Sequence, residues 1–118
     1  MAEARDIVKR YFEARTSGDA ATARSLLRDD LSFRGPFDTF DNADDYTRAI
    51  QGFAQIVERD DRRTLLSEGD EAVLVYDLVT KTPAGTAPVA EWYRVRDGRI
   101  AAIQAFFDAR PFAAMREA

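Results

Sequence analysis

The chain has 118 residues, of which 46% are hydrophobic and 32% charged, and its formal net charge is −4. This composition is typical of one soluble domain, and a chain of this length can bury about two thirds of its unfolded surface without covalent cross-links. It contains no cysteine and no histidine, which excludes disulfides, thiolate metal sites, thiol nucleophiles and Ser-His-Asp triads.

The acidic balance also limits the partners that we expect. Phosphate binding needs a net basic face, so nucleic acid is not an expected partner. The N-terminal stretch MAEARDIVKRYF is amphipathic rather than apolar and does not predict a signal peptide, and no apolar run reaches membrane-spanning length. We therefore expect a cytoplasmic protein that contacts no membrane.

The first part of the chain predicts two helices. Apolar residues recur at helical spacing from Ala4 to Phe12, and Gly18 is a natural C-terminal cap for that helix. Asp19 can cap a second, shorter helix. The apolar side of that second helix consists of Ala23, Leu26 and Leu27.

A short strand and a third helix follow. The strand is expected at Leu31–Phe33, where Gly35-Pro36 ends it. Asn42 is the predicted N-cap of the helix, and acidic residues occupy its first turn. Its apolar face is predicted to comprise Tyr46, Ala49, Ile50, Phe53, Ile56 and Val57. The charged run ERDDRR is interpreted as the solvated end of this helix.

From Arg63 onward the hydrophobic period changes to two, which predicts strands. RRTLLSEGD predicts a short strand and a turn, and EAVLVYDLVTKT a long strand. TAPVAEWYRV and RIAAIQAFFDA then form a hairpin around Asp97-Gly98. Asp108 with Arg110 is expected to anchor a C-terminal tail. The order of elements predicts an α+β fold with helices against one face of a strongly bent sheet.

Two stretches carry a resemblance to a known family: YFEARTSGDAATARSLLRDDLSFRGP near the front and AEWYRVRDGRIAAIQAFFD near the end. In their order and spacing they resemble the SnoaL-like branch of the nuclear transport factor 2-like superfamily, over nearly the whole chain. The resemblance implies one domain spanning 1–118. Its fold would be a cone-shaped α+β barrel, with three N-terminal helices packed on a curved, mixed, largely antiparallel sheet.

The same resemblance implies a pocket at the wide end of the cone and dimerisation through the outer face of the sheet. The superfamily includes ketosteroid isomerases, polyketide cyclases, epoxide hydrolases, dehydratases and many proteins without enzymatic activity. The fold alone therefore does not assign the activity.

Three residues are candidates for catalysis. Tyr11 occupies a place similar to that of the isomerases' oxyanion-binding tyrosine, although a tyrosine at helical spacing also fits a packed core. By its spacing from DGRI, Glu91 takes the place of their carboxylic acid. If Glu91 is buried it could donate a hydrogen bond when neutral or accept a proton when ionised, and otherwise it is a rim carboxylate paired with an arginine. Asp77 interrupts an apolar strand, and alternation places it on the outer face unless a bulge reverses it.

The bases of the related enzymes are missing at two positions. Gly35, in FRGP, stands where the isomerases carry an aspartate, and Ala105 stands near the inward aspartate of the cyclases. Neither residue can move a proton. Steroid-type isomerisation by the same mechanism is therefore not expected.

Aromatic residues either line an apolar cavity or fill the core. If the cavity exists, it suits a flat, small hydrophobic molecule held by Phe33, Phe37, Tyr46, Phe53, Tyr76, Tyr93 and Phe107, together with Phe40. Trp92 alternates with Glu91 and should lie on the outer sheet face, where an exposed indole favours a homodimer. No phosphate-loop or calcium-loop pattern is present, so neither cofactor nor metal is expected.

Three functions remain open from the sequence. The first is a cofactor-independent isomerase, cyclase, lyase or hydrolase acting on a small apolar carbonyl or polyketide-like molecule. The second is a non-catalytic domain that binds an apolar ligand in the same cavity. The third is an interaction module that uses the outer face of the sheet.

Overall fold

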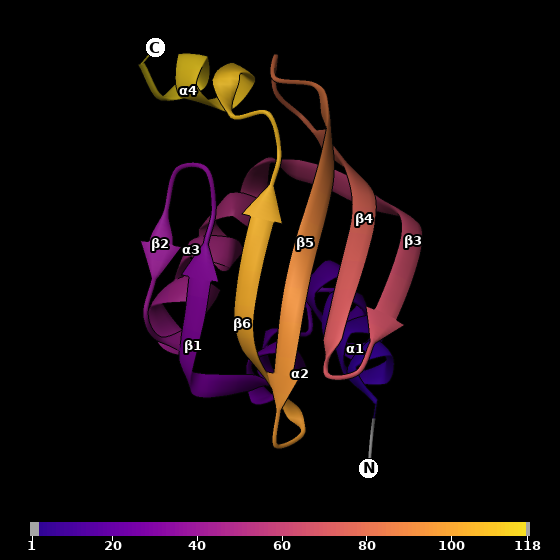
Figure 1. Ribbon diagram of the computed structural model, residues 1–118. Coiled ribbons are helices and arrows are strands. Elements are labelled where there is room, and N and C mark those ends of the chain that lie inside the picture. The colour runs from indigo at the N-terminus through magenta and orange to yellow at the C-terminus, as the bar shows by residue number, and fades with distance from the viewer. Residues whose placement is uncertain (1–2, 118) are drawn as a thin grey trace.

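Helices dominate the first part of the chain and strands the second, as the sequence predicts (Figure 1). The structure, a computed structural model, describes residues 3–117. Its first elements are α1 (Ala4–Thr16), α2 (Ala20–Ser25), β1 (Leu27–Arg34), β2 (Thr39–Phe40), α3 (Ala43–Phe53) and the 3₁₀ turn η1 (Ala54–Ile56). The later elements are β3 (Val57–Glu68), β4 (Glu71–Thr80), β5 (Thr86–Arg96), β6 (Arg99–Phe106) and α4 (Arg110–Glu117).

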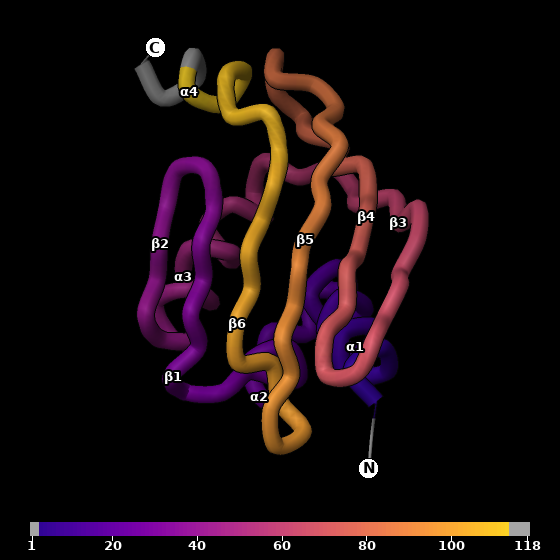
Figure 2. The backbone as a smooth tube through the Cα atoms, in the orientation of Figure 1, coloured from indigo at the N-terminus to yellow at the C-terminus, as the bar shows by residue number. Residues whose placement is uncertain are grey.

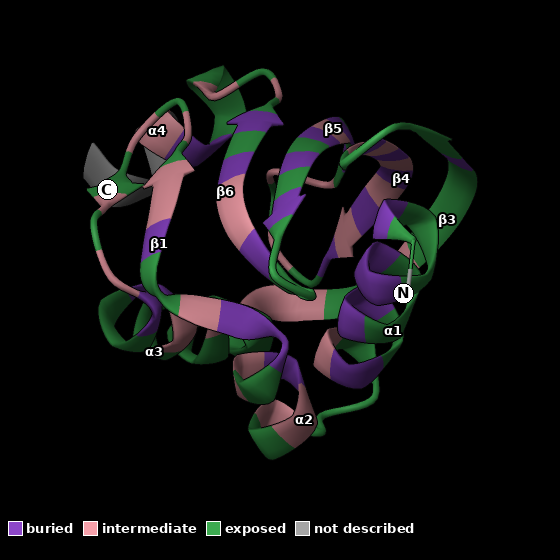
Figure 3. Ribbon diagram, turned by 60° about the horizontal axis from the view of Figure 1, so that its bottom comes forward, coloured by how far each residue is buried: buried purple, intermediate pink, exposed green. Residues whose placement is uncertain are grey.

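The strands form a single mixed sheet in the order β2-β1-β6-β5-β4-β3. β1 runs parallel to β6, and every other neighbouring pair is antiparallel. The sheet is open rather than closed, and it curls so that α1 packs on β3 and β4 at one edge while α3 packs on β1 at the other (Figure 3). This confirms the α+β class, with a bent sheet and helices against its concave face.

The hairpin between β5 and β6 sets which side chains face inward. Asp97 and Gly98 have φ values of 54° and 78°, the left-handed pair that a tight hairpin turn requires. The register shifts between Arg94 and Val95, which leaves Ala101 as the extra residue of a bulge. Strand β5 itself alternates without interruption, so the bulge does not turn Glu91 away from the inner face.

The prediction for ERDDRR is wrong. The third helix ends at Phe53, and the charged run lies within β3 rather than at a helix end. β3 is an edge strand with most of its side chains exposed, so it shows little of the hydrophobic alternation by which a strand is recognised. The strand predicted at Leu31–Phe33 is also longer, because β1 begins at Leu27.

The core fills the space between α1 and the inner face of the sheet. Ile7 and Val8 of α1 are at most 1% exposed and belong to one cluster with Leu74, Tyr93 and Ile103 of the sheet. The N-cap predicted at Asn42 is confirmed, because its side chain accepts a hydrogen bond from the Asp45 backbone amide at 2.8 Å.

The C-terminal helix closes one end of this arrangement. Figure 2 shows the chain leaving β6 and turning into α4 at the same end of the sheet as the β4–β5 loop. Phe112 of α4 is buried, and its ring packs on Phe53 at 6.2 Å and on Phe107 at 5.6 Å between ring centroids. Within residues 3–117, no helix combines the length and the apolar character needed to cross a membrane.

Candidate functional site

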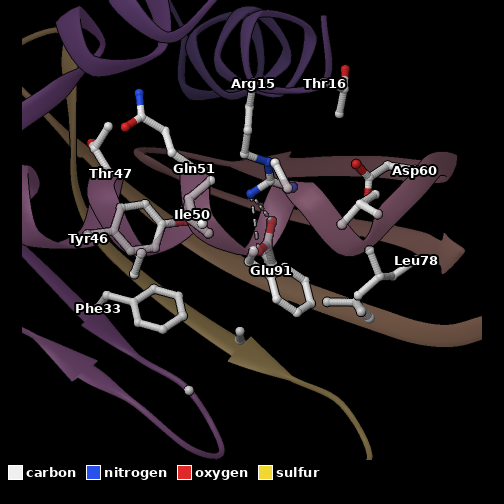
Figure 4. Close-up of a pocket in the computed structure, with 18 of the residues that line it drawn as sticks. Arg15, Thr16, Phe33, Tyr46, Thr47, Ile50, Gln51, Asp60, Leu78 and Glu91 are labelled. Carbon is white, nitrogen blue, oxygen red and sulfur yellow. Dashed lines mark hydrogen bonds and ion pairs between the residues drawn. The ribbon is translucent and has the colours of Figure 1, made fainter. Parts of the chain in front are cut away.

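A cavity of about 1060 Å³ lies between α3, the end of α1 and the inner face of the sheet. Its volume is similar to that of pockets that hold drug-sized molecules. Strands β1, β3, β4, β5 and β6 contribute to its wall, and Figure 4 shows several of the lining side chains. The aromatic residues on the wall are Tyr11, Phe33, Phe37, Phe40, Tyr46, Phe53, Tyr76, Phe107 and Phe112. Of the aromatic residues proposed from the sequence, only Tyr93 does not line the cavity. Its side chain is fully buried in the core.

Glu91 lies at the polar centre of the wall. It is 4% exposed and accepts a hydrogen bond from the Tyr93 hydroxyl. Arg15 lies in the last turn of α1. Its Nη1 atom is 3.4 Å from each carboxylate oxygen of Glu91 (Figure 4). Because both neighbours donate to it, this geometry favours an ionised, accepting Glu91 over a neutral donor.

Aromatic rings hold the Arg15 guanidinium in place. Its central carbon lies 5.2 Å from the ring centroid of Phe12 and 5.6 Å from those of Tyr11 and Tyr76. Burial alone would lower the pKa of Arg15, but Glu91 and the surrounding tyrosines raise it well above its usual value. Arg15 therefore remains a cation inside a largely apolar wall, and its partner 76 residues away provides the compensating charge.

Tyr11 and Tyr46 form a second polar group on the wall. The Tyr11 hydroxyl donates to that of Tyr46 at 3.3 Å, and both residues are almost completely buried. Burial raises the pKa of both phenols, so both stay protonated near neutral pH and serve as donors rather than bases. Tyr11 is thus brought to the same cavity as Glu91, but its hydrogen-bond partner is Tyr46.

Asp77 lies outside this group. Its neighbours Tyr76 and Leu78 are buried and line the cavity, whereas Asp77 sits on the outer face with its carboxylate 3.7 Å from Arg63. Alternation alone accounts for this placement, and β4 carries no bulge at that point in its pairing with β5.

The two positions without a base both border the cavity. Ala105 is the cross-strand partner of Glu91, which places it on the inner face. A side chain at Gly35 would begin 3.0 Å from the Phe33 ring, so that ring fills the space that an acid at this position would need. The cavity therefore has no proton-transferring group at either place.

The sequence interpretation missed three acids on the wall, of which Asp38 and Glu58 are exposed. Asp60, from the run read as a helix end, is half-buried on β3 and lines the cavity. Burial raises the pKa of its carboxyl, and the nearby Arg15 offsets this only in part. No alternation in the sequence could have identified it, because every residue of ERDDRR is charged. Among residues 3–117, no three acidic side chains are gathered in a way that could hold a metal ion.

Comparisons with known proteins agree with this architecture. The model of the SnoaL-like domain family matches residues 8–103. A search of curated proteins finds no relative by sequence. A crystal structure of a protein from Kribbella flavida DSM 17836 shares 29% identity with a TM-score of 0.87, over 96% of this chain and 93% of that one.

Two further structures share the fold at lower identity. A candidate ketosteroid isomerase from Kribbella flavida DSM 17836 has 18% identity and a TM-score of 0.81, covering 89% of this chain and 77% of its own. A candidate polyketide cyclase from Sinorhizobium meliloti has 18% identity and a TM-score of 0.79, covering 86% of this chain and 94% of its own. From its family match the chain belongs to the SnoaL-like domain family, and it shares its fold with solved structures of nuclear transport factor 2-like proteins.

Proposed function

We propose that this SnoaL-like protein holds a small hydrophobic molecule in its cavity and acts on it as a cofactor-independent isomerase, cyclase, lyase or hydrolase. The observation that carries the proposal is the Arg15–Glu91 ion pair, with side chains 10% and 5% exposed, on a largely apolar wall. A buried ion pair rarely stabilises a fold more than well-packed apolar side chains would. Its position beside a cavity is therefore better explained by chemistry than by stability.

The polar groups have complementary roles toward a bound carbonyl compound. Arg15 and the phenol of Tyr46, which accepts a hydrogen bond from Tyr11, are donors, and they suit an oxygen on which negative charge develops. Glu91 is an acceptor held between two donors, and it suits the position of a general base or of a group that orients Arg15. Thr47 adds a buried hydroxyl on the same wall that has no hydrogen-bond partner among the described residues.

The relatives support the class of reaction rather than its details. The candidate ketosteroid isomerase and polyketide cyclase share this fold at 18% identity. The resemblance associates those reactions with acids at two positions, however, and this chain has Gly35 and Ala105 there. We therefore propose a related chemistry on an apolar carbonyl substrate with a different set of acids.

The proposal is tested with Glu91→Gln and Tyr11→Phe. A panel of apolar ketones and polyketide-like compounds is first screened by thermal shift and native mass spectrometry, and compounds that bind are then incubated and analysed for products. We expect turnover to fall by about 100-fold or more in each variant, the usual contribution of a proton-transferring group or an oxyanion donor. Asp30→Asn, at an exposed acid paired with Arg28, is the control. Unchanged turnover in both site variants would contradict the proposal.

Non-catalytic binding in the same cavity is the alternative. Gly35 and Ala105 favour it, because two positions that carry bases in related enzymes are occupied here by residues that cannot move a proton. Under this alternative the screen finds compounds that raise the melting temperature, and none of them is converted on prolonged incubation. Any turnover that depends on Glu91 would rule it out.

We also propose that a second copy of the chain covers the outer face of the sheet. Leu66, Trp92 and Phe106, on three different strands, are 64%, 41% and 49% exposed on that face. The cross-strand pairs Leu66–Val73 and Val73–Trp92 make this surface continuous across β3, β4 and β5. Apolar surface of this kind is typical of an interface between protein chains.

Replacing Trp92 with alanine should convert the dimer into a monomer, because the variant removes the largest apolar side chain of this surface. Sedimentation velocity at micromolar concentration measures the change, and ligand binding in the cavity should be unaffected because Trp92 lies on the opposite face. A wild-type protein that sediments as a monomer would refute the dimer.

A further inference from the structure

We propose that Asp60 is the proton acceptor of this cavity, and that the substrate is an apolar ketone with an acidic C–H bond next to its carbonyl group. The inference rests on the proposed function and deepens it, since it assigns the base and the substrate class of the same site.

The charged run in β3 separates into an outward and an inward set. Asp61 lies opposite Asp77 in the register, and both carry arginine partners: Arg59 Nε at 3.0 Å from Asp61 and Arg63 at 3.7 Å from Asp77. Asp60 lies opposite Leu78 instead, and both residues line the cavity (Figure 4). Within the part of the chain that the structure describes, no hydrogen bond or ion pair engages the Asp60 carboxylate.

A carboxylate without partners is a better proton acceptor than one that is fully engaged. Glu91 already receives hydrogen bonds from Tyr93 and Arg15, so taking a proton would require it to give up those contacts. Asp60 gives up no such contact. Burial raises its pKa above the ordinary 3.8, which strengthens it as a base, while Arg15 limits that rise. The carboxylates of Glu91 and Asp61 raise the pKa of Asp60 further.

The remaining polar groups can hold the oxygen on which charge develops. In the proposed step the Asp60 carboxylate takes the proton, so the substrate C–H bond breaks and an O–H bond forms on Asp60. The electron pair of the C–H bond moves onto the carbonyl oxygen, which becomes an enolate oxygen. Arg15 and the phenol of Tyr46, which accepts a hydrogen bond from Tyr11, are the donors available to that oxygen. The Asp60 carboxyl then exchanges its proton with solvent and returns a proton to carbon, which regenerates the carboxylate without a further reactant.

Hydrogen–deuterium exchange of 2-tetralone in D₂O tests this step without knowledge of the natural substrate. This small, flat ketone has acidic C–H bonds beside its carbonyl group, and proton NMR follows their replacement by deuterium. We expect the wild-type protein to accelerate exchange above the rate in buffer and Asp60→Asn to reduce that acceleration by about 100-fold or more. Asp61→Asn, one residue away on the opposite face, should exchange like the wild type, since Arg59 keeps its contact with Glu58.

The outcomes separate this inference from the proposed function. Exchange that is lost in Glu91→Gln but unchanged in Asp60→Asn would overturn the role of Asp60 and leave the proposed function standing. Absence of exchange by the wild type would overturn the substrate class, whereas the proposed function is judged on the wider compound panel. Binding of 2-tetralone to each variant, measured by thermal shift, shows whether a loss of exchange lies in binding or in proton transfer.

Stability measurements provide an independent check on Asp60. A carboxyl whose pKa is raised by folding destabilises the folded state once pH rises above its ordinary pKa of 3.8, because the native state then holds its proton more tightly than the unfolded state. Asp60→Asn should therefore melt at a higher temperature than the wild type near neutral pH, and the difference should disappear below about pH 3.8. A lower melting temperature at neutral pH would show that Asp60 is a structural acceptor and would contradict the proposal.

Discussion

Replacing Arg15 with leucine is expected to lower the free energy of unfolding by about 3–5 kcal/mol, the usual cost of leaving one partner of a buried ion pair uncompensated. The Arg15 and Glu91 side chains are 10% and 5% exposed, so water cannot fully take over the role of the guanidinium. Of the two donors to Glu91, only the Tyr93 hydroxyl would then remain. Urea denaturation of the two proteins measures the difference.

A double-mutant cycle separates the pair from the loss of packing around Arg15. Combining Arg15→Leu with Glu91→Gln removes both charges, so the double variant should recover a large part of the stability that Arg15→Leu loses. Arg48→Leu is the matched surface control, because its contact with Asp45 at 3.2 Å is exposed and should contribute less than about 1 kcal/mol. A coupling energy near zero between Arg15 and Glu91 would show that the two charges do not depend on each other.

Replacing Leu74 with alanine should cost about 3 kcal/mol. Leu74 is 0% exposed at the centre of β4, directly opposite Glu91 in the register, and it packs in the cluster that includes Val8 and Ile103. Removing its branched end leaves a void that neighbouring strands cannot fill without moving, and Leu→Ala changes at such sites cost about 2–5 kcal/mol. Urea denaturation of the variant measures the loss.

Leu74→Met provides the control for volume, because a side chain of similar size that is more flexible usually costs less than about 1.5 kcal/mol. If alanine and methionine destabilised the protein equally, the loss would not come from a void.

Much of the site's orientation could be predicted because it follows from local backbone geometry. The left-handed turn at Asp97-Gly98 sets the β5–β6 hairpin, and the unbroken alternation of β5 puts Glu91 and Trp92 on opposite faces. The same rule places Asp77 on the outer face of β4. In each case successive side chains in a strand point to opposite faces, and this holds without knowledge of the rest of the fold.

Asp60 could not be assigned in the same way. It lies in an edge strand whose charged side chains obscure the alternation, and the preceding helix pattern extends almost to its position. Its inward orientation becomes clear only from its pairing with Leu78 on β4. Edge strands carry weak sequence signals because only part of one face is buried.

The sequence by itself determined the α+β order of elements and the hairpin at Asp97-Gly98, and it predicted that Glu91 and Trp92 point to opposite faces and that Asp77 lies outward. Only the tertiary structure decided that Glu91 faces inward and meets Arg15, that Tyr11 meets Tyr46, and that a cavity lies between them and Asp60. The physical reason is the range of the interactions. Turn geometry and strand alternation act over a few neighbouring residues, whereas these pairs depend on how a curved sheet brings distant segments onto one wall.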